Sequence, residues 1–443
     1  MDTPVPIPNT EVKHRSGEGI RAIGENSEPP GFFFLSKICY TNVVMNKINF
    51  IFLRSKVGKD ERFKDEEKKR FLDELNQNND FEFDESGTPV FFIETGGTEE
   101  IFKSIFKNYS EPYFILATDA NNSLPASLEI ATFLRNNNKK FKLFHGKSTE
   151  VRELLKNEEI CKISAKNGSF LKTKALKDMR LGVVGKPSDW LIASDVNYKE
   201  VEEKLGLTLL DIKTEEFLEE IKTAKAKVDP VIFEHLLNEK VNKKTLEGAL
   251  QIYSALRNII TKHNLDGVTV RCFDLLNSVK NTSCLALAML NKDGYIATCE
   301  GDIPTMISMA LVRKVFHESS FQVNPSYLNL KEKYGYFAHC TLPLDMCLDY
   351  KFDTHFESGI GLGISGRLNL GKVTIFKMNA NLKDYEIFEG QIVENLHKNN
   401  LCRTQVKIVF NDPIDEMFSK PNGNHLVIFL GAHKQELVKM LSN

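Results

Sequence analysis

At 443 residues the chain is long enough for two or three domains that each bury a core of their own. Its hydrophobic residues (42%) and charged residues (27%) occur in the usual proportions of a globular protein, which excludes a disordered or fibrous chain. The 58 basic and 60 acidic residues give a net charge of −2, and no basic cluster is interleaved with aromatic residues. Nucleic acid is therefore not an expected partner.

Two features of the sequence concern the location of the protein in the cell. No apolar run has the roughly 18 residues that a membrane helix needs, so no membrane partner is expected. The eight cysteines are scattered without a CxxC pair, which favours reduced thiols and a cytoplasmic protein.

Residues 1–44 differ in composition from the rest of the chain. They carry five prolines and scattered polar residues, with no helical or strand periodicity before Phe32. We expect a disordered extension here, with Met45 as an alternative initiator. A signal peptide would need a basic end ahead of an apolar core and a cleavage site, in an order that this segment does not provide.

Residues 45–168 alternate between strand and helix patterns. Strands are expected at residues 48–53, 90–93, 113–118 and 141–145, and helices at residues 59–76, 99–108 and 123–136. This alternation predicts a Rossmann-like domain, with a parallel sheet covered by helices on both faces. Small polar residues at 95–98 and around Asn122 follow two of the strands. They could let the backbone approach a ligand, which makes Asn122 a candidate for substrate binding, or they could only cap the next helix.

A lysine-rich span at residues 164–177 marks a boundary, and a second Rossmann-like domain is expected over residues 169–320. Its first strand runs into a turn where Lys186 could bind an anion or a sugar hydroxyl and Trp190 could stack on a sugar ring. An ordinary turn with a buried tryptophan explains the same residues equally well. Arg271, in the predicted strand of residues 268–273, is a further candidate for substrate binding.

Two acidic residues follow the last strand of this second domain. The strand at residues 295–299 ends at Glu300 and Asp302, and Pro304 suits the first turn of a helix that continues over residues 306–316. The carboxyl ends of strands are where α/β folds place their ligands. Carboxylates there could bind a divalent cation or transfer a proton. Helix capping explains Asp302 alone but leaves Glu300 without a role.

Residues 321–443 change to short β-rich runs, which predict an antiparallel β domain with a final helix from Lys434. The expected fold class is therefore α/β, with two Rossmann-like parallel-sheet domains followed by a β-rich C-terminal domain. Three of the histidines in this last part, His339, His355 and His425, lie at expected strand ends or in turns. A lone histidine is more often structural than a ligand, but three of them downstream of Glu300 favour a shared site.

Several short motifs occur in order along the chain. They are Thr-Gly-Gly-Thr at 95–98, Asn-Ser-Leu at 122–124, Gly-Lys-Pro-Ser-Asp-Trp at 185–190, Cys-Glu-Gly-Asp at 299–302, Ala-His-Cys-Thr at 338–341 and Gly-Asn-His at 423–425. Together they resemble the L-fucose isomerase and L-arabinose isomerase superfamily, from Lys47 to the C-terminus. The resemblance rests on order and spacing, because no single motif is specific. It implies a monosaccharide substrate and a homo-oligomer, either a trimer or a hexamer.

The resemblance also implies roles for individual residues. Glu300 matches the acidic residue that binds a divalent ion, usually Mn²⁺, and transfers a proton. His425 matches a metal ligand near the C-terminus, and His339 fills the place of a further histidine in the arabinose isomerase branch. The family's second carboxylate falls at Asn324, which departs from the pattern. An amide offers a carbonyl oxygen at most and cannot act as a base. Proton transfer therefore rests on Glu300 with another partner, either Asp302 or a water.

The resemblance thus implies a metal-dependent intramolecular oxidoreductase that interconverts an aldose and a ketose through a cis-enediol, with Glu300 as metal ligand and base, and the residue types fit this chemistry. The amide at Asn324 keeps an alternative open, in which the protein is a catalytically degenerate member that binds a sugar or regulates a pathway. A nucleotide-dependent oxidoreductase is a third interpretation, but the chain lacks a dinucleotide fingerprint.

Overall fold

The computed structural model describes residues 39–40, 46–55, 61–156, 160–161, 174–226 and 241–442. Of the expected extension at residues 1–44 it describes only β1 (Cys39–Tyr40), which pairs antiparallel with β7 (Ile160–Cys161). The rest of that segment, Met45, and most of the predicted boundary at residues 164–177 lie outside the described residues. The described helices include none with the length and apolar character of a membrane span.

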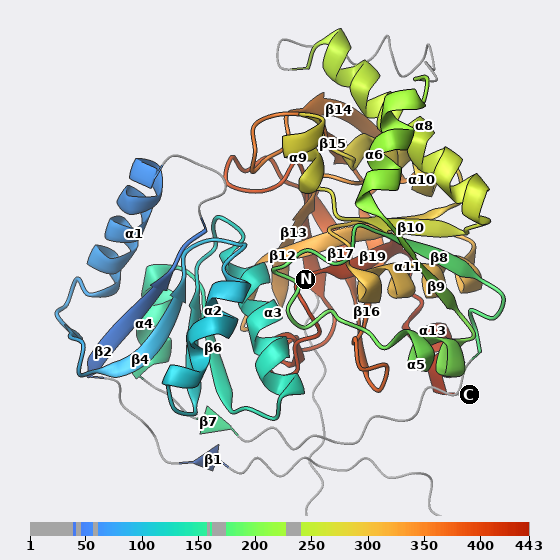
Figure 1. The fold of residues 1–443 in the computed structure, drawn as a ribbon. Helices are drawn as coiled ribbons and strands as arrows, with labels where there is room; N and C mark the ends of the chain where they lie inside the picture. The colour runs from blue at the N-terminus through green and yellow to red at the C-terminus, as the bar shows by residue number, and fades with distance from the viewer. Residues whose placement is uncertain are drawn as a thin grey trace, which may run out of the picture. The chain divides into compact units, whose positions relative to one another are not determined.

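A five-stranded parallel sheet forms the N-terminal part, in the order β3-β2-β4-β5-β6, and is drawn in blue to cyan in Figure 1. Its strands are β2 (Lys47–Leu53), β3 (Glu82–Phe83), β4 (Thr88–Ile93), β5 (Tyr113–Ala117) and β6 (Phe141–His145). The helices are α1 (Glu61–Leu75), α2 (Glu99–Ile105), η1 (Phe106–Asn108), α3 (Ser123–Asn136) and α4 (Ser148–Lys156). The elements predicted for this part are confirmed, and β3 and α4 are additional.

A four-stranded parallel sheet follows, in the order β11-β10-β8-β9. Its strands are β8 (Arg180–Val184), β9 (Thr208–Ile212), β10 (Gly267–Val270) and β11 (Ile296–Cys299). The helices are α5 (Tyr198–Leu205), α6 (Thr214–Thr223), α8 (Lys243–His263), α9 (Asp274–Ser278), α10 (Cys284–Lys292) and α11 (Ile303–Phe316). The prediction of two parallel-sheet units in series is thus confirmed.

The C-terminal part is the predicted antiparallel β domain, and its strands close into a barrel in the order β12-β13-β18-β17-β16-β19. These strands are β12 (Phe321–Asn329), β13 (Tyr334–His339), β16 (Gly371–Met378), β17 (Tyr385–Asn395), β18 (Thr404–Phe410) and β19 (Leu426–Leu430). Beside the barrel lie a hairpin of β14 (Asp349–Asp353) and β15 (Gly363–Arg367), and the helices η2 (Leu344–Met346), α12 (Glu416–Ser419) and α13 (Lys434–Ser442). Closure removes the exposed edges of the sheet.

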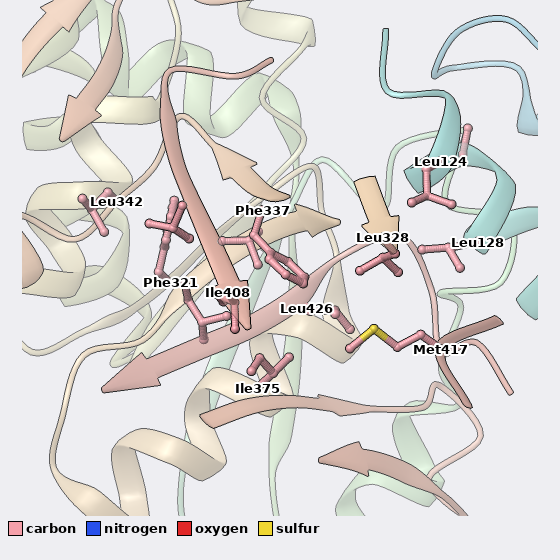
Figure 2. Packing of buried hydrophobic residues seen from close by; sticks show 14 of the residues in the cluster. Leu124, Leu128, Phe321, Leu328, Phe337, Leu342, Ile375, Ile408, Met417 and Leu426 are labelled. Atoms are coloured by element: carbon pink, nitrogen blue, oxygen red, sulfur yellow. The ribbon is translucent and has the colours of Figure 1, made fainter. Parts of the chain in front are cut away.

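One buried hydrophobic cluster joins the N-terminal sheet to the barrel. Leu124 and Leu128 of α3 belong to the same cluster as Leu328 of β12 and Leu426 of β19 (Figure 2). A hydrogen bond adds to this contact, because the backbone N–H of Leu328 donates to Nε2 of His145 at the end of β6. Through this packing the strand-end turns of the first sheet face residues of the barrel.

Candidate active site

The turn after β11 fixes the position of Glu300. Both Glu300 (φ 66°) and Gly301 (φ 72°) adopt left-handed backbone conformations. A Cβ on Gly301 would lie 2.4 Å from the carbonyl oxygen of Lys186, so only glycine fits there. The N–H of Ser188 donates to the carbonyl oxygen of Glu300 over 2.9 Å. The loop after β8 and the turn after β11 are therefore locked together.

Asp302 caps α11 and is fully buried. Its Oδ1 accepts a hydrogen bond of 2.7 Å from the N–H of Thr305, as the capping interpretation expects. The same carboxylate lies 3.2 Å from Nζ of Lys377, which is also buried. Burial alone would raise the pKa of Asp302, but Lys377 and His425 together hold it well below its usual range.

Two histidines from the barrel approach Glu300. His339 ends β13 and His425 precedes β19, and both are buried. Nε2 of His425 lies 3.3 Å from Oε1 of Glu300, and Nε2 of His339 lies 3.9 Å from the same oxygen. The three side chains each offer one ligand atom, and these atoms lie within 4.8 Å of one another. Such a group of one carboxylate and two imidazoles is suited to a divalent metal ion.

Hydrogen bonds orient both imidazole rings. Nδ1 of His425 lies 2.9 Å from Oδ2 of Asp302, and a carboxylate can only accept, so this nitrogen carries a proton. Nε2 of His425 is buried and has no hydrogen-bond partner of acceptable geometry. Nδ1 of His339 lies 2.9 Å from the hydroxyl of Thr341. Fixed rings with an open Nε2 are the usual arrangement of histidine ligands.

The charges in this group shift one another's pKa values. Burial opposes ionisation of both Glu300 and His425. The electrostatic attraction between the two charged side chains outweighs this effect of burial. The pKa of Glu300 is held well below its usual range, chiefly by His425 and then by His339. Glu300 and Asp302 raise the pKa of His425 to about 9. A metal ion bound here would replace the proton on His425.

Trp190 contacts the other oxygen of Glu300. Its Nε1 donates a hydrogen bond of 2.6 Å to Oε2, and its ring meets Phe273 edge to face at 4.8 Å between centroids. The loop that carries Trp190 is held by Arg271, which donates to the carbonyl oxygen of Pro187 and forms an ion pair of 2.7 Å with Asp189. Trp190 thus orients Glu300, and stacking of its ring on a sugar stays a prediction.

A cavity of about 300 Å³ opens beside Glu300. Its walls come from strand-end turns of the first sheet, from the loops after β8 and β10, from the barrel and from the turn between β14 and β15. Its polar lining residues include Glu99, Glu100, Asn122, Asp189, Trp190, Glu300, Asn324, Glu357 and Asn424. The volume is at the lower end of the range for small-molecule sites, roughly 300–1,000 Å³.

The structure brings only some of the predicted site residues to this cavity. Four of them line it, namely Glu300, Asn324, Trp190 and Asn122. His339 and His425 contact Glu300, and Asp302 lies behind His425. Lys186, Arg271 and His355 lie outside the lining: Lys186 is exposed, Arg271 holds its loop, and Nδ1 of His355 pairs with the hydroxyl of Ser358.

Three glutamates of the cavity, Glu99, Glu100 and Glu357, were not among the predicted site residues. Glu357 lies in the turn between β14 and β15, where its Oε1 accepts a hydrogen bond of 2.5 Å from Nδ2 of Asn122. Burial and the charge of Glu300 raise the pKa of Glu357 to about 7. Glu99, the first residue of α2, is buried, and its Oε2 has no hydrogen-bond partner. A glutamate in a turn and one at a helix start are ordinary patterns, so neither gives a signal in the sequence.

No protein-family model matches the chain. The chain is similar to a sulfoquinovose isomerase of Priestia aryabhattai, with 21% identity over 344 residues, which cover 72% of this chain and 73% of that protein. A sulfoquinovose isomerase of Alkalicoccus urumqiensis is also 21% identical, over 324 residues that cover 68% of each chain. The similarity is distant and extends over about two thirds of the sequence.

Proposed function

We propose that this chain is a metal-dependent isomerase that interconverts an aldose and a ketose. The observation that carries the proposal is the convergence of Glu300, His339 and His425, whose ligand atoms lie within 4.8 Å of one another beside the cavity. The distant similarity to sulfoquinovose isomerases supports the same class of reaction.

The residues present fit a divalent ion such as Mn²⁺. Nε2 of His425 is a buried nitrogen without a hydrogen bond, which makes it available as a ligand atom, and Asp302 fixes the ring from the other side. Glu300, His339 and His425 would hold the ion, and Asn324 could add a carbonyl oxygen, since it lines the cavity. When bound, the ion supplies a Lewis acid that stabilises negative charge on the sugar oxygens.

Glu300 is the proposed base. It takes the proton from the carbon beside the carbonyl and returns it to the neighbouring carbon, with a cis-enediol between the two steps. Its low pKa keeps the carboxylate ionised, and its side chain is only 13% exposed, so bulk water competes little for that proton. The hydrogen bond from Trp190 keeps the carboxylate in place during both transfers.

An uncharged monosaccharide is the proposed substrate. Five carboxylates line the cavity, namely those of Glu99, Glu100, Asp189, Glu300 and Glu357, and among its described lining residues there is no lysine, arginine or histidine. The relatives are named for sulfoquinovose, a sugar with a sulfonate group. A sulfonate in this cavity would find no cationic side chain among the described lining residues and would lie near the ionised carboxylate of Glu300. Like charges are costly to bring together where water is scarce.

Deuterium exchange tests the function. The full chain, with and without Mn²⁺, is incubated in D₂O with uncharged aldoses and with sulfoquinovose, and NMR follows deuterium at the exchanging carbon and formation of ketose. We expect Mn²⁺-dependent exchange with at least one uncharged aldose. Exchange with sulfoquinovose alone would overturn the proposed substrate, and no exchange with any sugar would overturn the isomerase.

Glu300→Gln tests the base within this assay. We expect kcat to fall by roughly 10²–10⁴-fold, the usual contribution of a general base, while the fold is retained. Glu318→Gln alters an exposed glutamate after α11 and should retain wild-type activity. If Glu300→Gln stays as active as Glu318→Gln, Glu300 is not the base.

Asn324 favours a second candidate function, a sugar-binding protein that does not turn over. An amide replaces a carboxylate here, and it adds no charge to the metal group. Asn324→Asp should tighten Mn²⁺ binding and raise or keep the activity if the chain is a weakened isomerase. A variant that gains Mn²⁺ affinity while both proteins bind a sugar without any exchange would favour the binding protein.

The homo-oligomer implied by the resemblance stays a prediction that sedimentation can test.

A further inference from the structure

An aldose–ketose isomerisation needs two kinds of proton transfer. One proton moves between carbons, and another moves between the two sugar oxygens. Glu300 accounts for the carbon proton, but Asn324, at the place expected for a second carboxylate, cannot hold or give up a proton. A second group that carries a proton between the sugar oxygens is therefore expected in the cavity if the proposed function is right.

We propose that Glu357 is this second catalytic residue, which donates a proton to one sugar oxygen and takes one from the other, and that Asn122 positions it. The proposal rests on the proposed function and adds a residue to it. Glu357 lines the same cavity as Glu300 and Trp190. The hydrogen bond from Asn122 holds only Oε1, across 235 positions of the sequence.

The turn that carries Glu357 is fixed by its own hydrogen bonds. The N–H of Gly359 donates to the carbonyl oxygen of His355 over 2.9 Å, and the N–H of His355 donates to that of Ile360 over 3.1 Å. Phe356, next to Glu357, lines the cavity too. A short turn braced in this way can hold a carboxyl group at a constant position against the substrate.

The other carboxylates of the cavity are less suited to this role. Asp189 is held in an ion pair with Arg271, and Glu100 pairs with Lys103 at 3.0 Å on the outside of α2. Oε2 of Glu99 is shut away from solvent. Glu357 remains partly exposed, so a sugar can reach it. Its pKa, raised to about 7 by burial and by Glu300, agrees with a group that carries a proton near neutral pH.

The two carboxyl groups exchange protons with the sugar in two halves of the reaction. Glu300 takes the proton of C2, the C–H electron pair forms the C1=C2 bond, and the π pair of C1=O1 moves to O1, which takes the proton of Glu357. In the second half the Glu357 carboxylate takes the proton of O2, that O–H pair forms C2=O2, and the C1=C2 pair takes the proton from Glu300 at C1. Both carboxyl groups end as they began, and no other reactant is consumed.

The test compares Glu357→Gln with Glu332→Gln in the full chain with Mn²⁺ and an aldose that the wild type converts. Gln keeps an oxygen that can accept the hydrogen bond from Asn122, so the turn should persist. We expect kcat to fall at least 100-fold while KM changes less than threefold. Glu332 is exposed in the turn between β12 and β13, and its variant should match the wild type.

Chemical rescue separates catalysis from a structural role. Glu357→Ala leaves space for a small acid, so added formate should restore part of the lost kcat, at least tenfold, but should not restore Glu357→Gln. Two results would overturn the role of Glu357 but leave the proposed function standing. One is activity of Glu357→Gln within twofold of the wild type, and the other is a lost activity in Glu357→Ala that formate does not recover. A wild type that exchanges no sugar proton overturns the proposed function and this inference together.

Discussion

Oδ2 of Asp302 accepts a hydrogen bond of 2.9 Å from Nδ1 of His425 in the interior of the protein. The carboxylate thereby fixes the imidazole tautomer and turns Nε2 toward Glu300. The same carboxylate caps α11 and pairs with Lys377. One buried side chain therefore connects the helix after β11, the barrel strand β16 and the proposed metal group.

Asp302→Asn tests this connection. The amide can still cap α11, but the negative charge is lost. In the wild type that charge orients the His425 ring and makes the imidazole more basic. We expect the Kd for Mn²⁺ to rise roughly 10–100-fold, as for loss of other carboxylates behind histidine ligands. The EPR signal of free Mn²⁺ measures this affinity. An unchanged Kd would show that Asp302 only caps the helix.

Lys377→Met should destabilise the protein, because it leaves the Asp302 carboxylate buried without its lysine partner. Removal of one partner of a buried ion pair costs about 3–5 kcal/mol, which urea unfolding can measure. Lys372→Met is the matched control, since Lys372 lies on the same strand but is exposed. Equal stabilities of the two variants would mean that the ion pair contributes little.

Trp190 is the only tryptophan of the chain, so its fluorescence reports on the site directly. Its Nε1 donates to Glu300, a proposed ligand, and a paramagnetic ion bound there should quench it. We expect saturable quenching on titration with Mn²⁺. His425→Ala should abolish this saturation, because it removes one of the three ligands. Quenching that saturates equally in His425→Ala would place the ion elsewhere.

His145 should make the protein sensitive to acid. Burial lowers its pKa to about 3, from 6.5 in an unfolded chain, and Nε2 must stay unprotonated to accept from the N–H of Leu328. Below pH 6.5 the unfolded chain therefore binds a proton that the folded chain does not. This contribution to the free energy of unfolding is complete above pH 6.5 and falls by about 1.4 kcal/mol per pH unit down to pH 3.

Urea unfolding at pH 7.5 and pH 5 measures this effect. His145→Gln stays neutral at both values, so it should lose about 2 kcal/mol less than the wild type between them. His397→Gln, which alters an exposed histidine, should lose as much as the wild type. The same loss in all three proteins would exclude His145 as the source.

The fold followed largely from local patterns. Buried runs such as residues 113–118 alternate with amphipathic helices, and this alternation alone predicts parallel sheets with covered faces. The change to short β-rich runs after residue 321 predicted the antiparallel domain. The closure of its six strands into a barrel was not predicted, because closure depends on the pairing of β12 with β19, whose residues are about a hundred positions apart.

The residues of the site likewise fall into those that local sequence patterns identified and those that they did not. The turn at Glu300 was recognisable because a strand end, two acids and a helix start are adjacent in the sequence, and the histidines were candidates by residue type and position. Lys186 and Arg271 had the same kind of support. Lys186, however, is not among the residues that line the cavity, and Arg271 is bound to Asp189 and a backbone carbonyl. Residue type and strand position do not decide which way a side chain is held.

Glu357 and Asn122 show what only the tertiary structure decides. Each lies in an ordinary turn, and their hydrogen bond exists because α3 packs against β12 and brings turns from two sheets to one cavity. The sequence by itself determined the elements, since helix and strand formation depend on neighbours within a few residues. The composition of the cavity was decided by packing between distant segments, which local periodicity does not encode.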